Sequence, residues 1–365
     1  MIAESTKTSM PPPPQADAAG IPTLQRVDPT SYAGWDALLE PHPDATFFHT
    51  AAWARTLVAA YGFQCHYVAS IRDGQLLGLL PMMEANSFLR GKRGVSLPFT
   101  DESPALVSSG SQAGSFFDRA TEEGMQRGWK HLELRGGEHI VADAPGAVSY
   151  AGHRLVLDTE EKVLERFESS VRRAVRKAER SGVTVEFGQD LESLRTYYQL
   201  HCRIRTQKHG APPQPFKFFA AIYDNILRDG KGFVALARRN GRPVAGAVFF
   251  TFGPKAIYKF SASDDREQEF RGANLVLWRS LQHLLRSGAT ELNFGKTSLS
   301  NEGLRRFKRS WGAGEYLIRY ARYSLPERQF VKMTDLASGV QARIFALLPV
   351  FMSRWIGRAV YSHLS

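Results

Sequence analysis

Nearly continuous apolar runs alternate with amphipathic segments along most of the chain. The runs HYVASI, LLGLLPMM, FVALA and PVAGAVFF, at 66–71, 76–83, 233–237 and 243–250, are typical of strands covered on both faces. Between the two pairs of runs, the charged segment 160–182 has the spacing of a helix that ends at its last glycine. The pattern therefore predicts an α/β protein with mixed sheets.

Part of this pattern occurs twice. Residues 53–72 align with 219–238 at an offset of 166, and each stretch runs into a short turn and a second apolar strand. Farther on, GWKHLEL from Gly128 matches GATELNF from Gly288. Three similar segments in the same order indicate an internal duplication. We expect two similar domains, at 21–158 and 159–325.

Composition narrows the class of protein. The 365 residues are 43% hydrophobic and 23% charged, which is typical of a soluble globular protein. The two cysteines are too few for a disulfide framework, so a cytoplasmic location is expected. Residues 1–20 contain four consecutive prolines and are predicted to be a disordered tail. The apolar stretch 344–353 is well short of the roughly 18 residues that a transmembrane helix needs.

The charge balance points to an anionic partner. The chain has 47 basic and 36 acidic residues, a net charge of +11, which favours RNA, phospholipid or a phosphorylated substrate. Residues 301–365 contain eleven basic residues and four acidic ones. A second basic cluster lies at 172–180, where a solvated helix face is the simpler interpretation.

Sequence motifs for metal sites and catalytic triads are absent. The ten histidines lack HExxH spacing, and there is no GxSxG elbow or phosphate-binding Walker loop. His201 and His209 are eight residues apart with no adjacent carboxylate, so no metal site is predicted.

Three segments of the second half combine cations with loop residues. In segment 201–219, basic residues end a predicted helix just before a Gly-Ala-Pro-Pro loop. They either bind an anion or interact favourably with the helix dipole. Segment 256–281 reads as a strand, an acidic loop and a helix whose first N–H groups are suited to an anion. Segment 291–320 places a Gly-Lys pair after a strand. The candidate substrate-binding residues are Arg205, Lys208, His209, Lys259, Ser263, Arg271, Asn274, Gly295, Lys296 and Trp311.

These segments resemble a known family. SLPFTDESPAL, RTQKHGAPPQPFKFF, YKFSASD and LNFGKTSLSNEGLRRFKRSWGA are similar to recurring segments of the FemAB-type acyltransferases, particularly those associated with exosortase and exopolysaccharide gene clusters. The resemblance spans about residues 45–325 and implies two tandem GNAT-like domains. It also implies transfer of an acyl or aminoacyl group onto an amine of a cell-envelope or exopolysaccharide precursor, with no bound cofactor.

The resemblance leaves two donors open, aminoacyl-tRNA and acyl-CoA. The pyrophosphate cradle of GNAT enzymes, Q/R-x-x-G-x-G/A, would fall on EFRGAN at 269–274, where Glu269 and Asn274 replace the expected types. A glutamate repels a pyrophosphate, so we expect salt-sensitive tRNA binding and no tight acyl-CoA binding.

Acyl transfer suggests roles for three residues. Lys308 is the candidate cation for the oxygen of the tetrahedral intermediate, and we expect it to be exposed. Asp264 or Asp101 is the candidate for proton relay, although a loop carboxylate is more often a helix N-cap. No general base is assigned.

A basic, amphipathic extension is expected at 326–365. Within it, residues 336–361 suit a helix lying on the inner face of a membrane, and docking onto the protein's own core or a partner chain is the alternative. A different class of function is a non-catalytic membrane- or RNA-binding module built on a decayed acyltransferase fold.

Overall fold

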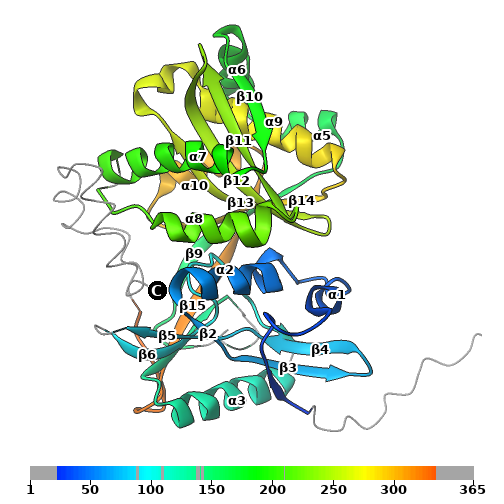
Figure 1. The fold of residues 1–365 in the computed structure, drawn as a ribbon, viewed down its shortest axis with the longest axis vertical. Helices are drawn as coiled ribbons and strands as arrows, with labels where there is room; N and C mark the ends of the chain where they lie inside the picture. Colours follow the sequence, from blue (N-terminus) through cyan, green and yellow to red (C-terminus); the bar gives the residue numbers. More distant parts are fainter. Residues whose placement is uncertain are drawn as a thin grey trace, which may run out of the picture.

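The computed structural model describes residues 23–87, 90–107, 111–136, 140, 144–208 and 210–333 (Figure 1). The tail predicted at 1–20 and the helix predicted at 336–361 lie outside these residues. The helices are α1 Trp35–Leu39, α2 Ala51–Tyr61, α3 Ser111–Arg127, α5 Glu160–Arg166, α6 Ser169–Arg180, α7 Leu191–Arg203, α8 Phe216–Ile222, α9 Gly272–Arg286 and α10 Glu302–Ser310, with short helices η1 Phe47–His49, η2 Ile204–Lys208, η3 Tyr223–Leu227 and η4 Asp265–Phe270.

The strands form two sheets. They are β1 Gln25–Val27, β2 Gln64–Cys65, β3 Tyr67–Arg72, β4 Gln75–Leu80, β5 Met83–Ser87, β6 Gly91–Val95, β7 Leu106–Val107, β8 His131–Arg135, β9 Val148–Val156, β10 Thr184–Gly188, β11 Gly232–Arg239, β12 Arg242–Phe252, β13 Lys255–Ser263, β14 Glu291–Ser298, β15 Gly314–Ser324 and β16 Gln329–Val331. The smaller sheet has the order β1-β3-β4-β7, and the larger has β10-β11-β12-β13-β14-β9-β15-β8-β6-β5-β2 with β16 beside β15. The expected mixed α/β class is confirmed.

The two predicted hairpins, β3–β4 and β11–β12, share their turn and an irregularity. Both central residues of each turn have positive φ, at Asp73-Gly74 and Asn240-Gly241, as in the tight turns that match the twist of paired strands. The register shifts between Ser70 and Ile71 in one hairpin and between Ala237 and Arg238 in the other. Both shifts therefore begin three residues before the turn.

The larger sheet contains strands from both halves of the chain, because two strands pair with strands of the opposite half. Strand β9 comes from the first half but pairs with β14 on one side and β15 on the other. Strand β15 comes from the second half and pairs with β8 of the first. The predicted boundary at 158 stays a prediction, but the chain on each side of it contributes strands to one continuous sheet.

The largest core cluster also draws on both halves. Helix α2 packs on α8, the helix that the repeat places at the equivalent position. Trp53 of α2 and Phe218 of α8 are fully buried, and their ring centroids lie 6.1 Å apart. Burying each such ring contributes roughly 1.5–3 kcal/mol, so the halves are joined by a core as well as by a sheet.

Two local expectations need correction. The predicted helix at 160–182 is two helices, because the backbone at Phe167 is extended and its buried ring packs against Trp278 and Trp311. The predicted extension at 326–365 begins with a strand, β16, paired with β15.

Candidate functional site

A cavity opens where two strands of the larger sheet separate. Strands β13 and β14 run parallel, and their pairing ends at Ile257 and Asn293. Beyond that point lies a cavity of about 180 Å³, the strand opening, which also contacts α10. It is lined by Asp101, Tyr258, Lys259, Phe260, Ser261, Phe294, Gly295, Lys296, Leu304, Phe307 and Lys308.

Each strand at this opening has a bulge beside a candidate residue. In β13, Tyr258 and Phe260 pair with adjacent residues of β12, so Lys259 is the extra residue. In β14, Asn293 and Lys296 face Arg154 and Gly152 of β9, so two residues of β14 lie opposite one of β9. Bulges redirect side chains and are common next to active sites. Here they direct both lysine-bearing segments towards the opening.

Lys308 enters the opening from the last turn of α10. Its Nζ donates to the carbonyl oxygens of Gly295 at 2.9 Å and Lys296 at 3.4 Å, and only 4% of the residue is exposed. Burial lowers the pKa of Lys308 to about 8, and the charge of Asp101 opposes this effect. The expectation of an exposed lysine was wrong, because α10 packs against β14 and the exchanged strand β9.

Asp101 and Lys259 form an ion pair at the same opening. Lys259 Nζ lies 3.0 Å from Asp101 Oδ2 and donates to the carbonyl of Phe99 at 2.9 Å. Burial acts to raise the pKa of Asp101, but Lys259, Lys296 and Lys308 outweigh it and the pKa is lowered. Asp101 is therefore ionised at neutral pH and neutralises part of the surrounding positive charge.

A second cavity, the cationic cleft, adjoins the opening and has a volume of about 420 Å³. Lys296 lines both cavities, and its Nζ lies 4.0 Å and 4.2 Å from the ring centroids of Tyr150 and Tyr320. Arg205 of η2 and Arg135 of β8 also line the cleft. With four cations against one carboxylate, Asp101, the cleft is suited to an anion.

A third cavity, the α9 cavity, lies at the start of helix α9 and measures about 690 Å³. The predicted start of this helix at Gly272 is confirmed. Arg173 and Lys177 of α6 line the cavity, and Phe307 lines both this cavity and the strand opening. The predicted residues that line it are Lys208, Ser263, Asp264, Arg271 and Asn274.

The carboxylates of the α9 cavity are already paired. Asp264 caps η4 by accepting from the backbone N–H of Arg266, and its ion pair with that arginine lowers its pKa. This is the helix-cap alternative, and an ionised, paired carboxylate is a poor proton relay. Glu267, the other carboxylate that lines the cavity, lies 3.6 Å from Nη1 of Arg239. Lys208 pairs with Asp265 at 3.0 Å. Glu269 is exposed and does not line the cavity, so the expected repulsion of a pyrophosphate by this residue has no geometric basis.

Trp311 and His209 are the remaining predicted residues. Trp311 is fully buried beside Phe167 and Phe307, so its ring belongs to the core and lines none of the three cavities. His209 lies outside the described residues. Among those residues, no group of three or more histidine, cysteine, aspartate or glutamate side chains is arranged to hold a metal ion, and no helix is long and apolar enough to cross a membrane.

Several residues at these cavities were missed by the sequence reasoning. Arg135, Tyr150 and Tyr320 belong to strands that each pair with a strand from the other half of the chain, and no local pattern marks them. Arg173 and Lys177 lay in the basic cluster, and their spacing of four residues on one helix face was the available signal.

Comparisons with known proteins identify the fold. Residues 165–309 match the acetyltransferase (GNAT) domain family. The structure is similar to a crystal structure of FemX, with a TM-score of 0.64 and 16% identity over 81% of this chain and 96% of that one. No curated protein matches the chain in sequence.

Two further solved structures share the fold. One is L-PGS from Bacillus licheniformis, with a TM-score of 0.51, 15% identity, and 88% and 96% of the two chains covered. The other is the C-terminal domain of a putative lysylphosphatidylglycerol synthetase from Agrobacterium fabrum, with a TM-score of 0.50, 15% identity, and 88% and 97% covered. Residues 165–309 therefore form a GNAT acetyltransferase domain, and the chain shares the fold of these three structures.

Proposed function

We propose that the protein transfers an aminoacyl group from aminoacyl-tRNA onto an amine of an anionic cell-envelope or exopolysaccharide precursor. The observation that carries this proposal is that the three cavities adjoin one another in a row. The α9 cavity meets the strand opening at Phe307, and the strand opening meets the cationic cleft at Lys259 and Lys296. A donor and an acceptor entering from opposite ends would meet beside Lys308.

The donor binds in the α9 cavity. Exposed cations on α6 and at the start of α9 line this cavity, and their arrangement suits the phosphates of an RNA end. The acceptor binds in the cationic cleft, where Arg135, Arg205 and Lys296 hold an anionic group. The amine of the acceptor then reaches into the strand opening.

The reaction is an attack of the neutral amine on the ester carbonyl carbon of the donor. A C–N bond forms, and the carbonyl oxygen takes up negative charge, which the Lys308 ammonium stabilises. The intermediate collapses as the C–O ester bond breaks, and the RNA leaves as its 3′-terminal alcohol after taking up a proton. The amine loses a proton to solvent or to the substrate itself, since both nearby aspartates are ionised and paired.

Acyl-CoA is the second candidate donor. Helix α9 begins at the close-packed Gly272, and its first three residues line the cavity, so a helix N-terminus suited to an anion lies there. A CoA donor would follow the same steps, with a thiolate as the leaving group.

Calorimetry with the full chain separates these donors. We expect aminoacyl-tRNA binding that weakens steeply with salt, together with no micromolar binding of acetyl-CoA. Micromolar acetyl-CoA binding without tRNA binding would replace the aminoacyl donor by acyl-CoA.

A non-catalytic binding module is the alternative of another class. It would bind RNA or anionic vesicles without forming any amide product in a mass-spectrometric donor and acceptor screen. The buried, hydrogen-bonded Lys308 supports catalysis over this alternative, because a desolvated cation is costly unless it is held in place.

A further inference from the structure

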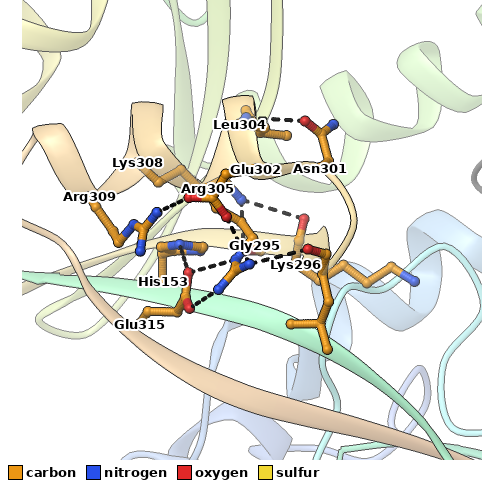
Figure 2. A network of polar contacts seen from close by, with 11 residues as sticks. His153, Gly295, Lys296, Asn301, Glu302, Leu304, Arg305, Lys308, Arg309 and Glu315 are labelled. Atoms are coloured by element: carbon orange, nitrogen blue, oxygen red, sulfur yellow. Dashed lines mark hydrogen bonds and ion pairs between the residues drawn. The ribbon is translucent and has the colours of Figure 1, made fainter.

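Near Lys308, a polar network joins β9, β15 and α10 (Figure 2). His153 of β9 and Glu315 of β15 face each other across an antiparallel pair. His153 is fully buried, and its Nε2 lies 3.0 Å from Glu315 Oε2. Glu315 accepts two hydrogen bonds from Arg305, at 2.6 Å and 3.1 Å. Arg305 lies on α10, one turn before Lys308.

The protonation of this network follows from its surroundings. The hydrogen bond from Arg305 is the largest effect on Glu315 and lowers its pKa, so the carboxylate is ionised and only accepts. Burial lowers the pKa of His153 to about 4, and the positive charges of Lys308 and Arg305 add to this while Glu315 opposes it. His153 is therefore neutral at neutral pH, and its Nε2 lies beside an ionised Glu315 carboxylate.

The network lies against the bulge that holds Lys308. Phe294 and Gly295 are the two residues of β14 opposite His153. Gly295 has φ of +69°, and a Cβ there would lie 3.0 Å from Asp101 Oδ2. This backbone turns the carbonyl of Gly295 towards Lys308 Nζ. His153 therefore contacts the bulge from one side while Glu315, through Arg305, holds α10 over it.

We propose that His153 and Glu315 are positioning residues, which fix α10 on the β14 bulge so that the Lys308 ammonium is held at the strand opening. The inference rests on the role proposed for Lys308, but its test does not need a substrate. The other charged groups facing Lys308 are Asp101 from the loop after β6, Lys259 from β13 and Lys296 from β14. All three are unchanged in the variants below.

The test measures the pKa of Lys308. The lysine is labelled competitively with acetic anhydride between about pH 6 and 11, and the extent of labelling is read by mass spectrometry of the peptide that contains it. We expect Glu315→Gln to raise the pKa of Lys308 from about 8 towards its ordinary value of 10.5, because water reaches a loosened side chain. Loss of the Glu315 charge alone would lower this pKa instead. The sign of the shift therefore separates positioning from direct electrostatics.

Glu302→Gln is the matched control. Glu302 also accepts from Arg305, at 2.9 Å, but it is exposed and pairs with Arg309 as well. We expect the pKa of Lys308 to stay at about 8 in this variant. An equal rise in both glutamate variants would mean that any partner of Arg305 suffices, which would overturn the role of His153.

His153→Gln is the second variant, since a neutral side chain replaces a neutral ring and the net charge is unchanged. It should raise the pKa of Lys308 in the same direction. An unchanged or lowered pKa in both Glu315→Gln and His153→Gln overturns the proposal. In the transfer assay, both variants should lower kcat roughly tenfold with KM unchanged. If the wild type transfers no group at all, the proposed function is contradicted, but the labelling result still tests the positioning role.

Discussion

The strand opening and the α9 cavity are both cationic, but they hold their charges differently. Lys308 and the Lys259 side chain are at most 5% exposed, and each donates to a backbone carbonyl. Arg173, Lys177 and Arg271 in the α9 cavity are exposed. A charge fixed in a low-dielectric site acts strongly on a reacting atom, whereas exposed charges are screened by salt and suit reversible binding of a polyanion. We therefore expect the first region to govern chemistry and the second to govern affinity.

The largest expected effect is on the transfer step itself. Lys308→Ala should lower the single-turnover rate by about 100-fold or more, or roughly 3 kcal/mol, because charge stabilisation in the transition state is lost. Arg309→Ala is the control, since Arg309 lies on the same turn of α10 but is exposed and paired with Glu302. Rates are compared at temperatures where both variants are fully folded. Equal rates would mean that the buried position of Lys308 confers no advantage over an exposed cation.

The buried lysine should also make stability depend on pH. The pKa of Lys308 is about 8 in the folded protein and 10.5 when unfolded. Between these values the unfolded chain binds more protons, so the free energy of unfolding rises with pH by roughly 3 kcal/mol. Denaturant titrations of the wild type and Lys308→Met at pH values across this window measure the difference. A difference that does not change with pH would show that Lys308 titrates as an exposed lysine.

A smaller effect is expected at the bulge. Gly295→Ala should destabilise the fold by about 1–2 kcal/mol, because it combines a positive φ with a Cβ close to Asp101. Gly303→Ala, in the exposed first turn of α10, should instead stabilise by up to about 1 kcal/mol. Thermal unfolding of both variants tests the contrast, and two changes of the same sign would contradict it.

The smallest effect is expected in the α9 cavity. Replacing Arg173 and Lys177 by glutamine should weaken tRNA binding roughly tenfold at low salt and reduce the slope of log K against log salt by about 0.7–0.9 for each residue. Replacing Arg176 and Arg180, which are exposed on the same helix but do not line the cavity, should change the slope less. Equal losses would indicate a diffuse surface rather than a site.

Local features of this molecule could be predicted from the sequence. The turns at Asp73-Gly74 and Asn240-Gly241 and the start of α9 at Gly272 depend on neighbouring residues, and all three are found in the structure. The Gly295-Lys296 pair was predicted to follow a strand, but it lies at a bulge inside β14, which continues to Ser298 against β9.

What could not be predicted depends on residues distant in the chain. Lys308 is buried because α10 packs against β9, which belongs to the other half of the chain. Trp311 is a core residue because it packs against Phe167, which interrupts a helix almost 150 residues earlier. His153 and Glu315 are ordinary strand residues until the exchanged strands bring them together. No pattern within either segment indicates this pairing.

The exchange of β9 and β15 makes the two halves mutually dependent for folding. A fragment that ends after β9 would leave that strand without either of its partners, and a fragment that begins after β9 would leave β14 and β15 with an open edge between them. Such unpaired edges favour aggregation over independent folding. Cutting the chain between the repeats should therefore yield two pieces that recover a native sheet only when mixed, which makes the duplicated fold a single cooperative unit.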